Sequence, residues 1–116
     1  MKVTFTLYRT PNNRFRVFIF KEDSRNFYVK HMATTYTLDE ALWIARHRED
    51  YRGLLDDGYE SDDEREDIWR SLLRDVELLE FYVNTDNQIA CNLYQSRVDP
   101  DELTKLIEFI EKELPQ

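Results

Sequence analysis

The feature that most constrains the fold is the alternation of apolar and polar residues in the first third of the chain. Apolar side chains occupy every second position in residues 3–7, again in residues 14–21, and in a shorter stretch at residues 27–31. This period of two is typical of β-strands with one face against a core. The turn-forming sequence Pro11-Asn12-Asn13 separates the first two stretches. Three strands joined by short turns predict an antiparallel meander.

Beyond residue 36 the sequence changes to the spacing of amphipathic helices. A Ser or Thr stands three positions before a Glu at two places, and in this capping box each side chain satisfies a free backbone N–H. The two pairs are Thr37 with Glu40, and Ser61 with Glu64. We expect the first helix to end before Gly53, because glycine suits the left-handed conformation that follows a helix. The second helix is expected to continue to about residue 79.

Apolar stripes identify the buried faces of the later helices. The second helix is expected to bury Ile68, Leu72, Val76 and Leu79, a stripe widened by Trp69 and Leu73. Residues 81–84 and 89–94 then predict a hairpin. A last helix begins at Asp99-Pro100, an N-cap followed by proline at the first helical position. Its expected stripe is Leu103, Leu106, Ile107, Ile110 and Leu114.

These elements predict a single α+β domain over residues 1–116, in the order βββααββα. An antiparallel sheet of about five strands would pack against three helices. Apolar residues make up 41% of the chain and aromatic residues 14%, which is too many for a disordered chain. The sequence has no continuous apolar run long enough for a membrane span and no leader-like apolar segment. With one cysteine, Cys91, the chain fits a reducing compartment, and we expect a cytoplasmic protein.

Few residues suggest catalysis. The two histidines, His31 and His47, are far apart in the sequence, and Cys91 alternates with apolar neighbours as a buried, inert thiol would. The sequence has no glycine-rich phosphate loop, no His/Cys metal spacing and no nucleophile elbow. We therefore expect a protein that is not an enzyme and that uses neither a metal nor another cofactor.

An acidic run is the strongest functional signal. Residues 56–67 carry a net charge of −7, within a chain whose total is −8. Acids in the first turn of a helix are favoured by the helix dipole, which accounts for Asp62, Asp63 and Glu64. That argument does not cover the acids before the helix, and like charges four residues apart repel. The candidate partner-binding residues are Asp56, Asp57, Glu60, Asp62, Asp63, Glu66 and Asp67.

Two functional hypotheses follow from this run. Its carboxylates could imitate nucleic-acid phosphates and occupy a basic surface of a partner protein, such as a nucleic-acid-binding protein or nuclease effector. In charge and size, though without a shared motif, the chain is similar to phage antirestriction and anti-CRISPR inhibitors. A toxin-immunity protein blocking a nuclease would need the same surface. Calcium binding is disfavoured, because placing Gly58 at the sixth position of an EF-hand loop puts Gly53 at the first.

A second candidate surface lies on the early strands, where residues 1–48 carry a net charge of +5. On one face of these strands, basic side chains alternate with aromatic rings, as they do on the sheet surfaces that bind nucleic acids. The alternative nucleic-acid-binding residues are Arg14, Arg16, Phe18, Phe20, Tyr28 and Lys30. Two other arrangements explain the same pattern: a helix or second protomer covers the aromatics, or the acidic helix packs near the basic strands. The net charge of −8 disfavours direct nucleic-acid binding.

Overall fold

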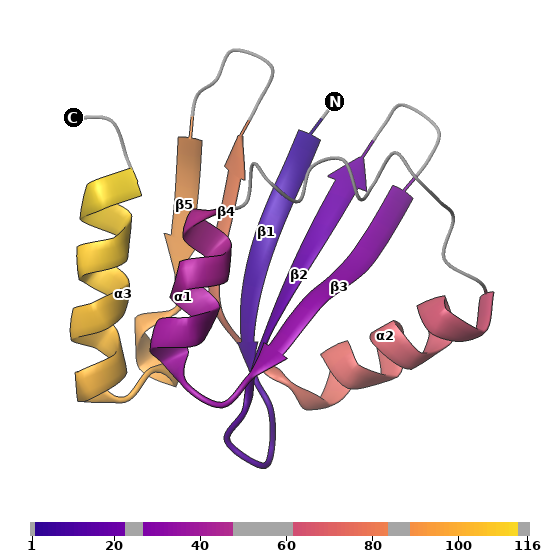
Figure 1. Cartoon of the computed structure of the whole chain (residues 1–116), viewed down its shortest axis with the longest axis horizontal. Helices are drawn as coiled ribbons and strands as arrows, with labels where there is room; N and C mark the ends of the chain where they lie inside the picture. Colours follow the sequence, from indigo (N-terminus) through magenta and orange to yellow (C-terminus); the bar gives the residue numbers. More distant parts are fainter. Residues whose placement is uncertain (1, 23–26, 48–61, 84–88, 114–116) are drawn as a thin grey trace.

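The computed structural model describes residues 2–22, 27–47, 62–83 and 89–113. Within these residues, five strands form one antiparallel sheet and three α-helices pack on it (Figure 1). The strands are β1 (Lys2–Arg9), β2 (Phe15–Glu22), β3 (Phe27–Thr35), β4 (Val76–Val83) and β5 (Ile89–Leu93). The α-helices are α1 (Leu38–Arg46), α2 (Asp62–Arg74) and α3 (Pro100–Glu113), and a short 3₁₀ helix, η2 (Gln95–Arg97), precedes α3. The α+β class and the order βββααββα are confirmed.

Strand order in the sheet is β3-β2-β1-β4-β5, so β1 lies at the centre. The predicted meander of β1, β2 and β3 is confirmed, and β4 returns to pair with the other edge of β1. At the β1–β2 turn, the backbone N–H of Thr10 donates to the Arg14 carbonyl at 2.8 Å. Asn13 has a φ of 61°, a left-handed conformation that asparagine tolerates better than most residues.

A β-bulge interrupts the ladder between β1 and β4. Leu7 pairs with Leu79, but the next residue, Tyr8, pairs with Glu77, which leaves Leu78 as an extra residue. Leu78 and Leu79 therefore both pack into the same core, and both are almost fully buried.

The first core lies between the sheet and helices α1 and α3, which pack side by side on one face (Figure 1). Its aromatic centre joins three elements: the rings of Phe5 and Phe81 stack at 5.4 Å between centroids, and Phe81 meets Phe109 of α3 at 5.6 Å. The other residues buried here are Leu7, Phe15, Val17, Ile19, Leu38, Ala41, Leu42, Ala45, Leu78, Leu79 and Leu106.

A second, smaller core lies on the opposite face of the sheet, under α2. Ile68 of α2 packs with Tyr8, Phe18 and Val29 from the first three strands. Phe20 and Leu72 are partly buried against this group. The sheet is therefore covered on both faces, and the second face of β2 points to a helix as well as the first.

The predicted extent of the second helix is wrong. Helix α2 ends at Arg74, where the Asp75 backbone N–H donates to the Ser71 carbonyl at 3.0 Å, and β4 begins at Val76. The expected stripe included Val76 and Leu79 because they continue the spacing of three or four residues that Ile68 and Leu72 begin. In the structure, both belong to the bulged strand β4. Pairing with β1 overrides the helical pattern, since it satisfies the β4 backbone and buries two leucines.

The predicted starts of α1 and α3 are confirmed. The Glu40 backbone N–H donates to Thr37 Oγ1 at 3.2 Å, and the Thr37 hydroxyl donates to the Glu40 carboxylate at 2.9 Å. Pro100 is the first residue of α3, and the Asp99 carbonyl accepts the Leu103 N–H at 2.8 Å. Helix α1 ends at Arg46, while Gly53 and the pair partner Ser61 lie outside the described residues.

Helix α3 buries Leu106 and Phe109, whereas the expected stripe included Ile107, which is 38% exposed. No described helix combines the length and the apolar character needed to cross a membrane.

This difference supplies a matched pair of variants on one helix. Leu106→Ala should lower the free energy of unfolding by about 2–5 kcal/mol, because it opens a cavity beside a fully buried position. Ile107→Ala removes the same number of carbon atoms from a half-exposed position and should cost less than about 1 kcal/mol. Urea denaturation measures both, and equal losses would contradict the placement of α3.

Candidate functional site

Helix α2 presents three different faces along its described side chains. Ile68 and Leu72, one turn apart, face the second core. Asp67 and Ser71 line a cavity between α2 and the sheet. The remaining face points to solvent and is called here the outer face of α2; it is formed by Glu66, Trp69 and Leu73, and Arg70 stands at its border with the cavity.

Two large apolar side chains lie on the outer face of α2. Leu73 is 87% exposed and Trp69 is 48% exposed. Both were expected to widen the buried stripe, which is wrong: among the described side chains of α2, Ile68 and Leu72 are the ones that pack in the second core. Beside them, Arg70 donates to the Glu66 carboxylate at 2.7 Å, one helical turn apart. The outer face therefore combines apolar groups with charged ones.

The acidic candidates fall into three groups. Asp56, Asp57 and Glu60 lie outside the described residues. Asp62 and Asp63 are the first two residues of α2. The last two of the set, Glu66 and Asp67, are both exposed, but they take different faces: Glu66 lies on the outer face of α2, and Asp67 lines the cavity.

The aromatic candidates on the strands do not form an open platform. Phe18 is 1% exposed, because Ile68 of α2 covers it and the Tyr8 ring meets it edge-on at 5.5 Å. Phe20 is partly buried in the same core. A base could stack on Phe18 only if α2 moved away, so the covering helix accounts for these rings. Tyr28 lies on β3, opposite Lys21.

The two arginine candidates are both engaged within the chain. The guanidinium of Arg14 lies 4.4 Å from the centre of the Tyr36 ring. Arg16 Nη1 lies 3.3 Å from Asp75 Oδ2, just beyond the end of α2. Lys30 lies on β3, half-buried, opposite Ile19. The arrangement places the end of the acidic helix next to one of the basic strands.

Asp75 connects α2 to β2. Its side chain is only 2% exposed, and burial raises the pKa of its carboxyl group while the Arg16 charge opposes that rise. The pair therefore fixes the end of α2 against the strand at a position where an unpaired charge would be costly.

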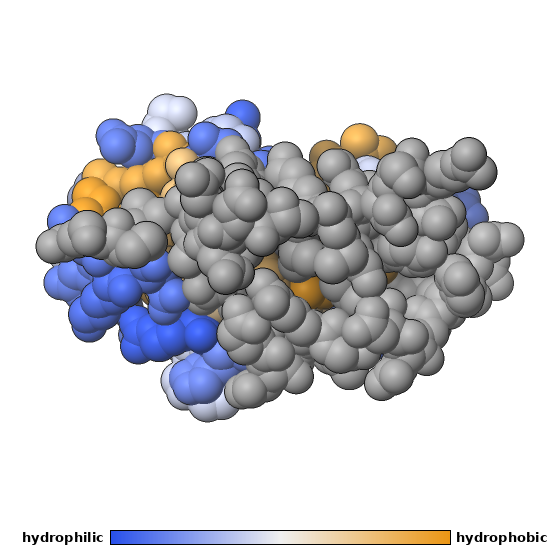
Figure 2. All heavy atoms as spheres, turned by 90° about the horizontal axis from the view of Figure 1, so that it is seen from above, coloured by the Kyte–Doolittle hydropathy of each residue, from blue (hydrophilic) through white to orange (hydrophobic). Residues whose placement is uncertain are grey.

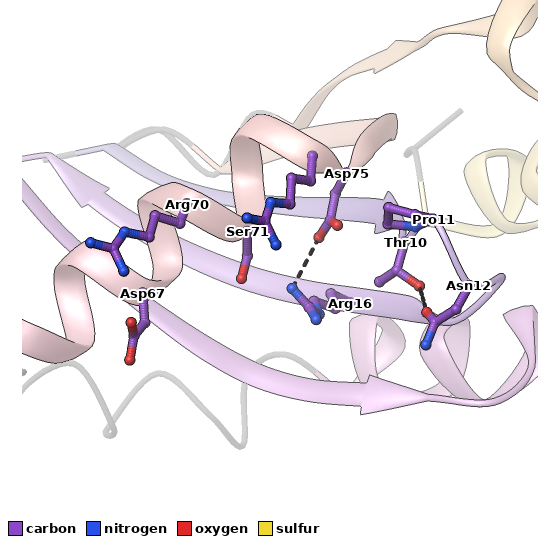
Figure 3. Close-up of a pocket in the computed structure, with 9 residues that line it drawn as sticks. Thr10, Pro11, Asn12, Arg16, Asp67, Arg70, Ser71 and Asp75 are labelled. Carbon is purple, nitrogen blue, oxygen red and sulfur yellow. Dashed lines mark hydrogen bonds and ion pairs between the residues drawn. The ribbon is translucent and has the colours of Figure 1, made fainter.

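A cavity of about 530 Å³ lies where α2, β2 and the β1–β2 turn meet (Figure 3). We call it the arginine groove; its lining is Thr10, Pro11, Asn12, Arg16, Asp67, Arg70, Ser71, Arg74 and Asp75. In Figure 3, Arg70, Ser71 and Asp67 come from α2, while Arg16 comes from the strand beneath. A smaller cavity of about 210 Å³ shares Arg16, Asp67 and Ser71 with it and reaches His31. Sequence reasoning missed this groove, because Arg16 is more than fifty residues away from Arg70 and Arg74 in the chain.

The histidines and the cysteine have structural partners. His31 Nε2 lies 2.9 Å from the Thr34 hydroxyl, and burial lowers the pKa of the imidazole, with Arg16 adding to the effect. His47 stacks on Trp43 at 4.1 Å between ring centroids. Cys91 packs against the first core, and burial raises the pKa of its thiol to about 11. Within the described residues, no three His, Cys, Asp or Glu side chains are grouped so that they could hold a metal ion.

Comparison of the chain with protein-family models, with curated proteins and with solved structures found no match.

Two glutamates of β4 lie close to Tyr8, a residue of the second core. Glu77 lies opposite Tyr8 and Glu80 opposite Thr6 in the β1–β4 ladder. Burial, followed by a hydrogen bond and repulsion from Glu80, raises the pKa of Glu77 to about 7, and Arg97 opposes the rise. Burial and the charge of Glu77 in turn raise the pKa of the Tyr8 hydroxyl to about 12.

The raised pKa of Glu77 predicts a pH dependence of stability. The folded state holds the proton more tightly than the unfolded chain, so this group's contribution is full below about pH 4.5 and is lost as the pH rises through about 7. Glu77→Gln should therefore gain stability relative to the wild type between pH 5 and 8, as measured by urea denaturation. Glu108→Gln, on the exposed side of α3, is the control, and a Glu77→Gln difference that stays constant with pH would contradict the assignment.

Proposed function

We propose that this chain is a small acidic protein-binding inhibitor that occupies a basic surface of a partner protein through the outer face of α2. The observation that carries the proposal is the exposure of Leu73 and Trp69 on a helix that begins in an acidic run. Exposed apolar side chains rimmed by charges are typical of protein interaction sites. Tryptophan is also among the residues that most often supply binding energy at interfaces.

The acidic charge next to the outer face of α2 indicates a partner surface that is basic. Residues 56–67 carry a net charge of −7, and the last of them belong to the first turns of α2. A basic partner surface would gain from this field, which accelerates association and makes it sensitive to salt. A surface that normally holds nucleic acid has the required positive charge, so the carboxylates would compete with phosphates for it. A nuclease blocked by its immunity protein is the second version of the same mechanism.

Several features favour a protein partner over direct nucleic-acid binding. The whole chain carries a net charge of −8, which repels a phosphate backbone. Phe18, the most central aromatic of the alternative surface, is buried under α2. Arg14 and Arg16 are held by Tyr36 and Asp75.

The test measures binding of the purified protein to a panel of nucleases and RNA-guided effector complexes at low and moderate salt. Leu73→Ser should weaken binding roughly tenfold or more, since removing an interface anchor costs about 1–2 kcal/mol or more. Ile107→Ser, on α3, is its control and should bind like the wild type. Glu66→Gln with Asp67→Asn should slow association, whereas Glu108→Gln with Glu111→Gln makes the same change in net charge elsewhere.

The control variants all lie on α3, on the other side of the sheet from α2. In Figure 2, the described surface on the left, where α3 lies in Figure 1, is largely hydrophilic and includes an apolar patch. Inhibition that survives both Leu73→Ser and the loss of the α2 carboxylates would contradict the proposal. Self-association abolished by Leu73→Ser would assign the outer face of α2 to a second copy. Nucleic-acid binding abolished by Arg14→Ala with Arg16→Ala would support the alternative surface.

A further inference from the structure

The arginine groove is separate in chemistry from the outer face of α2. Three arginines line it: Arg16 comes from β2, while Arg70 and Arg74 stand one turn apart on α2. Like charges at this spacing on a helix repel each other. The lining holds three arginines and two aspartates, a net charge of +1 in a chain whose total is −8.

The three arginines differ in how far they are neutralised. Arg16 is paired with the buried Asp75, and Arg70 is paired with Glu66 at the helix surface. Arg74 has no ion pair or hydrogen bond with any residue in the described part of the chain. A bound anion would thus meet one guanidinium with all its donors available and a second, Arg70, that is shared with an exposed carboxylate. Guanidinium groups suit this task because their planar donors match the oxygens of phosphate.

The rest of the lining is polar and suits hydroxyl groups. Ser71 offers its hydroxyl and Asp67 an acceptor carboxylate. The Thr10 hydroxyl donates to Asn12 Oδ1, so the side-chain NH₂ of Asn12 remains as a donor. No aromatic ring is among the residues that line the arginine groove, which disfavours a ligand that must stack. The volume of about 530 Å³ is in the range of small-molecule sites.

We propose that the arginine groove binds a small hydroxylated oxyanion of the sugar-phosphate class. Arg74 and Arg70 contact the phosphate, and Ser71, Asn12 and Asp67 contact the hydroxyl groups of the ligand. Arg16 is a positioning residue, since its pairing with Asp75 holds the helix against the strand that forms the floor of the groove.

The test follows backbone amide signals of the ¹⁵N-labelled protein by NMR during titration with glucose 6-phosphate, inorganic phosphate, citrate or glucose. Glucose 6-phosphate should cause saturable shifts centred on Asn12 and Ser71. Inorganic phosphate should shift the same signals with weaker affinity, and glucose should leave them unchanged. Ser71→Ala should reduce the preference for glucose 6-phosphate over phosphate.

Arg74→Gln should weaken binding of both phosphate compounds roughly tenfold or more, because a charge-assisted hydrogen bond is lost. Arg46→Gln is the matched control, since Arg46 also lies in the last turn of a helix but outside the groove. If Arg74 only stabilises the C-terminal end of its helix, Arg74→Gln and Arg46→Gln will bind phosphate with equal affinity, which would contradict the proposal. Leu73→Ser should bind glucose 6-phosphate normally, which keeps this test independent of the protein-binding proposal.

The proposal is overturned if no phosphate compound gives saturable shifts at millimolar concentrations. It is also overturned if the shifts are scattered over basic residues elsewhere, or if citrate alone binds. The spectrum of Arg74→Gln without ligand shows whether the variant folds. Should it not fold, Arg70→Gln replaces it, with the same expected loss of affinity and the same control.

Discussion

The structure depends on β1, which is hydrogen-bonded to a neighbour on each side and buried on both faces. Strands β2 and β4 occupy its two edges, so every other strand is placed by reference to it. Phe5 and Leu7 point to the first core, while Tyr8 belongs to the second. Successive side chains of a strand point to opposite faces of the sheet. A residue's place in this alternation therefore decides whether α2 or the pair of α1 and α3 covers it.

The two faces of the sheet are covered to different extents. Helices α1 and α3 together bury an extensive core, in which Leu106 and Phe109 are nearly inaccessible. On the other face, α2 is attached through Ile68, Leu72 and the pair formed by Asp75. A helix held by so narrow a stripe leaves most of its circumference to solvent. Both proposals concern that remaining circumference, one through its apolar side and one through its arginines.

The buried and exposed faces of the early strands could be predicted, because β1, β2 and β3 pair with one another and all alternate with a period of two. Phe15 and Val17 face the first core as expected, and on the other face Phe18 is covered by α2. The end of α2 could not be predicted in the same way. Val76 and Leu79 fit a helix and a bulged strand equally well by spacing, and only the partner strand β1 decides between them.

The candidate site was accessible to sequence reasoning only in part. The acidic run is visible as a local charge, but the exposure of Trp69 and Leu73 depends on how much of α2 the sheet can cover. Helical periodicity gives the direction of an apolar stripe and not its width. The arginine groove joins positions separated by more than fifty residues, and no local pattern connects Arg16 with Arg74.

The bulge at Leu78 has a consequence for how the chain tolerates changes in length. The residues on either side of Leu78 keep the pairing that a regular ladder would give them, since Leu79 faces Leu7 and Glu77 faces Tyr8. Loss of this one position would shorten the strand without turning any neighbour to the opposite face. Asp75 would then still reach Arg16 in the same register. Deletion of Leu78 would therefore keep the register of β4 against β1, while removing one fully buried leucine from the first core.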